Sequence, residues 1–143
     1  MPAPVGGEMT MDFHLELPRS SAAAGRARAA IADWFRGDVE DELLRSAQLA
    51  VSELTTNAYL HGRGTIVLRG DLDDDRLLVE VIDDGGGFER ELRERDFEGL
   101  GGRGLAIVDA EVSRWGIHEG TTHVWFELER PGPRLGREEK PSA

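Results

Sequence analysis

The feature that most constrains the fold is one apolar stripe in a long helical segment that ends at residues 51–61. At 3.6 residues per turn, small and aliphatic residues of this segment fall on one side of a helix; they are Leu43, Ala47, Ala50, Leu54 and Ala58. Glu53 and Asn57 are four residues apart and therefore stack one above the other at the border of the stripe. A carboxylate and a carboxamide there are well placed to face a pocket, although a solvated polar pair on an ordinary helix has the same spacing.

The composition is typical of one soluble globular domain, with 143 residues, 39% hydrophobic and 31% charged. The lack of cysteine excludes disulfides and thiolate metal sites. No apolar run approaches the roughly 20 residues of a membrane span, and the first ten residues lack the pattern of a signal peptide. We therefore expect a cytoplasmic protein that makes no direct contact with a membrane.

The charge distribution limits the partners and ligands that the chain can bind. A net charge of −11 argues against non-specific nucleic-acid binding, which depends on cations that contact phosphates. Lys140 is the only lysine, so the body of the chain lacks the lysine of a P-loop. These features favour protein partners, or an anion that is held by local dipoles.

Hydrophobic periodicity predicts a strand, two helices, two strands, a glycine-rich loop, a helix and two strands. The expected strands are 9–17, 64–72, 76–83, 113–118 and 122–129, and the expected helices are 20–36, 38–62 and 105–112. Because the strands come mostly in hairpins, we expect a mixed, mostly antiparallel sheet with all three helices on one face. This fold class is a two-layer α/β sandwich of the α+β type. It would span residues 9–130, with disordered segments at 1–8 and 131–143.

Asp83 ends an apolar strand and begins the pattern Asp83-x-Gly85-x-Gly87. The glycines allow a sharp turn and leave no Cβ to obstruct a flat ligand. A carboxylate at this point can accept hydrogen bonds from an amine edge such as that of adenine. A glycine turn with a capping aspartate is the alternative interpretation of these residues alone.

A second glycine cluster, at 99–104, precedes the third expected helix. Unpaired N–H groups and the helix dipole at such a position favour a bound anion, and Arg103 adds a formal charge. The spacing Gly99-x-Gly101-x-x-Gly104 also matches a dinucleotide fingerprint. That fingerprint belongs directly after a strand of a parallel sheet, whereas the preceding residues here are highly charged.

Other polar residues give weaker indications of function. The oxygen of Asn57 is a hard ligand suited to Mg²⁺, and Glu53 could activate a hydroxyl or water near a terminal phosphate. The carboxylates at 73–75 are expected to form a solvated turn. His61, His118 and His123 lack the spacing of a metal site.

Three blocks together resemble the nucleotide-binding module shared by gyrase, Hsp90, histidine kinases and MutL proteins. They are Glu53-x-x-x-Asn57, Asp83-x-Gly85-x-Gly87, and Gly102-x-Gly104 followed by Leu105. Within this GHKL superfamily the chain most resembles the small anti-sigma factor kinases, which are serine-protein kinases, over residues 9–130. The resemblance implies the Bergerat ATP-binding fold.

The same resemblance implies specific roles for residues. Glu53 would be the general base, and Asn57 would bind Mg²⁺. The residues expected to bind ATP are Asn57, Asp83, Gly85, Gly87, Gly101, Gly102, Arg103, Gly104, Leu105 and Thr122. Many relatives carry a lysine shortly before the last strand, where this chain has Thr121, Thr122 and His123, so a lysine contact near the phosphates is not expected.

Two functions are consistent with these features. The first is an ATP-dependent protein-serine/threonine kinase that phosphorylates an anti-sigma-factor antagonist of the STAS type and sequesters a sigma factor, as a homodimer. The second is an ATP-binding interaction module with little or no turnover. Neither function requires direct contact with nucleic acid.

Overall fold

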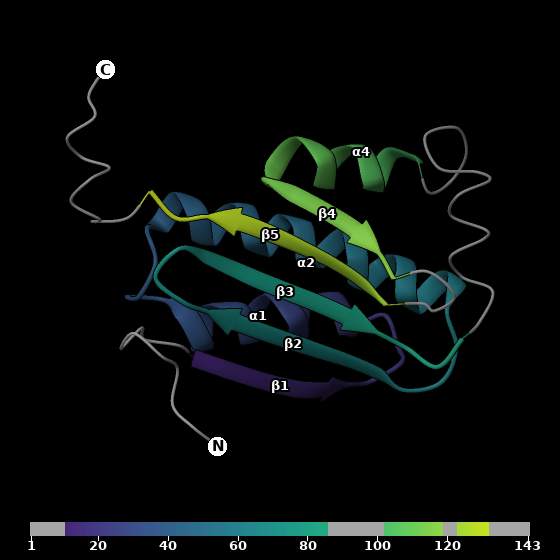
Figure 1. The fold of residues 1–143 in the computed structure, drawn as a ribbon. Helices are drawn as coiled ribbons and strands as arrows, with labels where there is room; N and C mark the ends of the chain where they lie inside the picture. Colours follow the sequence, from purple (N-terminus) through teal and green to yellow (C-terminus); the bar gives the residue numbers. More distant parts are fainter. Residues whose placement is uncertain (1–10, 86–101, 119–122, 132–143) are drawn as a thin grey trace.

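The computed structural model describes residues 11–85, 102–118 and 123–131 and arranges them in two layers (Figure 1). The strands are β1 (Met11–Leu17), β2 (Ile66–Leu72), β3 (Arg76–Ile82), β4 (Arg114–Ile117) and β5 (Val124–Glu129). The helices are α1 (Ala23–Phe35), α2 (Asp41–His61) and α4 (Gly102–Glu111). The strand order is β1-β2-β3-β5-β4, and each pair of these neighbours is antiparallel. The predicted two-layer sandwich is confirmed.

The core lies between the sheet and the helices. Along β3, Leu77, Val79 and Val81 are buried, whereas the residues between them are half-buried on the opposite face. This period-two pattern recurs in β2 and β5. The face that carries the half-buried residues is called the open face below. The helices cover the other face, as Figure 1 shows for α1 and α2 behind the sheet.

Helix α2 begins three residues later than the sequence pattern indicates. Asp38, the expected first residue, lies in a turn in which the Asp38 and Val39 amides both donate to the Phe35 carbonyl. Arg130, beyond the last strand, donates from Nη2 to the Asp38 carbonyl over 2.8 Å. Val39 is also buried, with 7% exposure. These tertiary contacts hold the segment in a turn, which explains the later start of the helix.

The turn between β2 and β3 is held by its first aspartate. The Asp73 carboxylate accepts hydrogen bonds from the backbone amides of Asp75 and Arg76, over 2.8 and 2.9 Å. This carboxylate therefore stabilises the turn, as is common for aspartate in hairpin loops.

Among the described residues, no helix has both the length and the apolar character needed to cross a bilayer.

Candidate functional site

Three chain segments that carry the predicted site residues converge at one end of the molecule. They are the C-terminal end of α2, the carboxyl end of β3 and the N-terminal end of α4, all on the right of Figure 1. Helix α4 packs against α2, and Ser46 near the start of α2 donates to Glu111 at the end of α4 over 2.9 Å. The two helices therefore run in opposite directions, which places the start of α4 beside the later turns of α2.

Asp83 is a buried carboxylate that directly follows β3. The alternation of the strand turns its side chain to the helix-covered face, and the residue is 7% exposed. Its Oδ1 atom accepts a hydrogen bond of 2.7 Å from the Gly85 amide. A Cβ atom added at Gly62 would lie 1.9 Å from Asp83 Oδ2. Gly62 therefore leaves the space that the carboxylate occupies at the end of α2.

Hydrogen bonds join the chain after α2 to the segment that carries Asp83. The Asp84 amide donates to the Arg63 carbonyl over 2.9 Å, and the Thr65 amide donates to Asp84 Oδ2 over 3.1 Å. Gly64 between them has a φ of +66°, a left-handed conformation that favours glycine. These bonds connect the end of α2 to the end of β3 and position Asp83.

Asn57 is buried in the penultimate turn of α2, with 7% exposure. Its Nδ2 atom is buried and has no hydrogen-bond partner among the described residues. A buried amide left without a partner costs about 1–3 kcal/mol, so a polar ligand at this position would offset that cost. Glu53, one turn earlier, is half-buried. The pair thus fits a site that binds a polar ligand.

Helix α4 contributes its N-terminus to this end of the molecule. Gly102 and Gly104 lie in its first turn, and the side chain of Leu105 is fully buried in the core together with Val108. Any contact between Leu105 and a ligand would therefore come from its backbone N–H. Gly87, Gly101 and Thr122 lie outside the described residues, as does the side chain of Arg103.

Sequence reasoning missed Arg19, which follows β1 and contacts the end of α2. Its Nη1 and Nη2 atoms donate to the Ala58 carbonyl over 3.0 and 2.9 Å. The Gly62 amide donates to the same carbonyl over 2.9 Å. Arg19 thus stabilises the last turn of the helix that carries Asn57. No local pattern identifies it, because the contact spans 39 residues.

The shifted pKa values among the described groups lie outside this site. Burial lowers the pKa of the His123 imidazole, although its hydrogen bond to Glu80 acts in the opposite direction. Burial and the neighbouring Asp12 carboxylate raise the pKa of Asp71. Both groups belong to the open face of the sheet, opposite Asp83.

Comparison with known proteins agrees with the resemblance that the three sequence blocks indicate. A model of the histidine kinase-like ATPase domain matches residues 17–128. The chain is also similar to the crystal structure of the RsbU and RsbW domains of Rv1364c from Mycobacterium tuberculosis, with 25% identity and a TM-score of 0.59. That likeness covers 84% of this chain and 31% of the other, so this chain spans about a third of its length. No curated protein gives a significant match.

The match with the family model includes all three segments that converge at the candidate site. It covers the end of α2 with Asn57, the end of β3 with Asp83, and the glycines at the start of α4. The strand order and helix placement agree with the fold expected from the sequence. The chain therefore belongs to the histidine kinase-like ATPase family.

Proposed function

We propose that the chain is an ATP-dependent protein-serine/threonine kinase of the anti-sigma-factor type. It would phosphorylate an antagonist protein of the STAS type and sequester a sigma factor, as a homodimer. The observation that carries the ATP site is the convergence of a buried carboxylate, a buried carboxamide and a helix N-terminus. Family membership supports the nucleotide, whereas the identity of both protein partners and the dimer rest on the resemblance.

Asp83 would select adenine. Its carboxylate accepts hydrogen bonds and cannot donate them when ionised. The exocyclic amine of adenine is a donor, whereas guanine carries a carbonyl oxygen at the equivalent position. A buried carboxylate facing that edge therefore favours ATP over GTP. Gly85 and Gly87 would let the base approach the backbone.

Asn57 and the start of α4 would hold the phosphates and Mg²⁺. A carboxamide can present its oxygen to the metal and its NH₂ group to a phosphate oxygen, which would satisfy the buried Nδ2 atom. Backbone N–H groups in the first turn of α4, which includes Gly102, Arg103 and Gly104, favour phosphate oxygens. Gly101 directly precedes this turn in the sequence. When bound, Mg²⁺ neutralises charge on the phosphates.

Glu53 would act as the general base. It lies one helical turn before Asn57 and on the same side of α2, so it would face the terminal phosphate from the same direction. A half-buried carboxylate can accept the proton of a serine or threonine hydroxyl as that oxygen attacks the γ-phosphorus of ATP, whose bond to the bridging oxygen breaks and releases ADP. Glu53 would therefore act in phosphotransfer, whereas Asp83 would act in ATP binding.

The experiment measures binding and transfer separately in the same variants. Dissociation constants for ATP and GTP would be determined by calorimetry. The rate of phosphotransfer would be measured with labelled ATP and a purified STAS-type antagonist. Asp83→Asn should weaken ATP binding at least tenfold and reduce the preference over GTP. Glu53→Gln should bind ATP normally and lose transfer at least a hundredfold. Asp74→Asn, in the exposed β2–β3 turn, is the matched control.

Other outcomes contradict separate parts of the proposal. Unchanged ATP affinity in Asp83→Asn would remove the adenine assignment. Normal transfer by Glu53→Gln would remove the general-base role. ATP binding without transfer by the unmodified chain to any STAS-type protein tested would favour the binding module instead of the kinase.

A further inference from the structure

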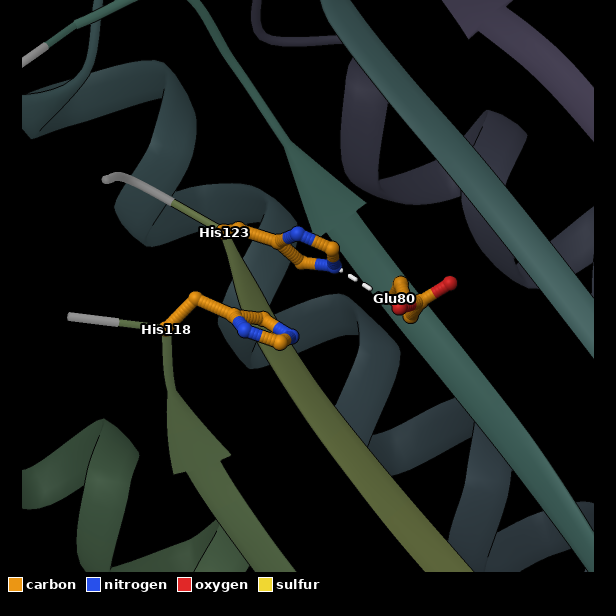
Figure 2. A group of neighbouring side chains, drawn as sticks. All are labelled: Glu80, His118 and His123. Atoms are coloured by element: carbon orange, nitrogen blue, oxygen red, sulfur yellow. Dashed lines mark hydrogen bonds and ion pairs between the residues drawn. The ribbon is translucent and has the colours of Figure 1, made fainter. Parts of the chain in front are cut away.

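The open face of the sheet carries a cluster of three potential metal ligands that the nucleotide site does not include. Glu80 lies on β3, His118 directly follows β4 and His123 directly precedes β5. Figure 2 shows both imidazole rings pointing toward Glu80, that of His123 from the start of β5 and that of His118 from the end of β4. Glu80 lies between the buried residues Val79 and Val81, so its side chain projects from the open face, away from Asp83.

The strand register brings these three residues together. The His118 amide donates to the His123 carbonyl over 2.9 Å, which sets the two histidines side by side. Glu80 is paired with Trp125, two residues after His123 in β5. Because side chains two residues apart share a face, Glu80 and His123 are diagonal neighbours. This placement follows from backbone pairing, so it does not depend on a single side-chain rotamer.

The distances are close to those of a metal site. His123 Nε2 lies 2.8 Å from Glu80 Oε2, and the two imidazole centroids are 4.2 Å apart. One ligand atom from each residue lies within 4.8 Å of the other two. Ligands of one tetrahedral zinc ion lie about 3.4 Å apart, given bonds of about 2.0–2.2 Å. Small rotations of the side chains, above all of the exposed His118, would reach that geometry.

The Glu80 carboxylate has contacts at both of its oxygens. The ion pair between Glu80 and Arg69 is long, 3.6 Å, and uses Oε1, whereas His123 contacts Oε2. A metal on Oε2 could therefore leave the Arg69 contact in place. Asp71 adds a further carboxylate on the same face.

We propose that Glu80, His118 and His123 bind one divalent transition-metal ion of the zinc class, with water completing the coordination. Two imidazole nitrogens and one carboxylate oxygen favour Zn²⁺ over Mg²⁺, which prefers oxygen ligands. The ion would join the β4–β5 hairpin to β3 on the face opposite the nucleotide site. It binds in the absence of nucleotide, which separates this site from the Mg²⁺ proposed at Asn57.

The test is a titration of the chelator-treated full chain, without a histidine tag and without nucleotide. Calorimetry with Zn²⁺ should give one ion per chain, and thermal unfolding should shift upward. Mg²⁺ at the same concentration should produce neither effect. Co²⁺ should give the visible absorption of a four-coordinate site with imidazole ligands.

Variants assign the ligands. His118→Ala, His123→Ala and Glu80→Gln should each weaken Zn²⁺ binding at least tenfold. His14→Ala is the matched control, because His14 is exposed on the same face and pairs with Arg69 on β2. Absence of Zn²⁺ binding by the unmodified chain would overturn the proposal. An equal loss in His14→Ala would overturn it as well, since binding would then be a general property of surface histidines.

Discussion

Replacing Gly62 by alanine should displace the Asp83 carboxylate and thereby weaken ATP binding. Gly62 has φ −91° and ψ −163°, a conformation that alanine adopts without strain. The added Cβ would nevertheless lie 1.9 Å from Asp83 Oδ2, 2.6 Å from its Cγ and 2.8 Å from the Ala58 carbonyl oxygen. The effect of this substitution is therefore steric, and it falls on the Asp83 carboxylate and on the Ala58 carbonyl.

The magnitude follows from the required movement. Ordinary van der Waals contact begins near 3.4 Å, so Oδ2 must retreat by about 1.5 Å if the backbone stays in place. A hydrogen bond of 2.7 Å, such as that from Gly85 to Oδ1, tolerates less than this. The displaced carboxylate would also lose the proposed hydrogen bond from the adenine amine. Loss of a hydrogen bond to a charged group costs about 1.5–3 kcal/mol, which predicts a roughly 10- to 100-fold loss of ATP affinity. Overpacking adds about 1–3 kcal/mol of destabilisation.

The assay is calorimetric titration with Mg-ATP at a temperature at which circular dichroism shows the variant to be folded. Gly25→Ala is the matched control, because a Cβ there meets only Arg28 Nη2 at 3.6 Å. Gly25 lies within α1, so this control should gain about 0.5–1 kcal/mol of stability and bind ATP normally. A folded Gly62→Ala variant with unchanged ATP affinity would refute the reasoning.

Two further predictions concern stability. Thr55 is fully buried, and its hydroxyl has no partner among the described residues. Thr55→Val should therefore raise the free energy of unfolding by about 1 kcal/mol or more. A lower urea midpoint in this variant would contradict the prediction. Asp71→Asn should add about 0.2–1 kcal/mol at neutral pH, because Asp71 faces Asp12 across the strands. Because burial and Asp12 raise the folded-state pKa of Asp71, its ionisation costs stability above that pKa. The gain should therefore vanish as the pH falls below the ordinary value of 3.8, and urea midpoints that show a growing gain at low pH would contradict the sign.

Most elements could be predicted from sequence because their periodicity is local. Strand β3 and helix α2 each bury one face, and the apolar spacing in the sequence reports this directly. The aspartates at 73–75 likewise mark the turn between β2 and β3. Asn57 and Asp83 were identified because each belongs to a short pattern with a chemical reason, although their roles stay predictions.

The remaining features depend on register and on distant contacts. Arg19 reaches Ala58 across 39 residues, and a single sequence carries no signal for that pairing. The cluster of Glu80, His118 and His123 requires the alignment of three strands. Spacing along the chain suggested no metal site, because Glu80 precedes His118 by 38 residues (118 − 80).

The measurement that tests the nucleotide site most directly is thermal unfolding with and without Mg-ATP, in the unmodified chain and in Asn57→Ala. ATP at about 100 times its dissociation constant stabilises the fold by about 2.7 kcal/mol, which corresponds to an upward shift of roughly 10 °C for a domain of this size. We predict that the shift requires Mg²⁺ and is lost in Asn57→Ala. Equal shifts in both proteins, or no shift in either, would contradict the proposed site.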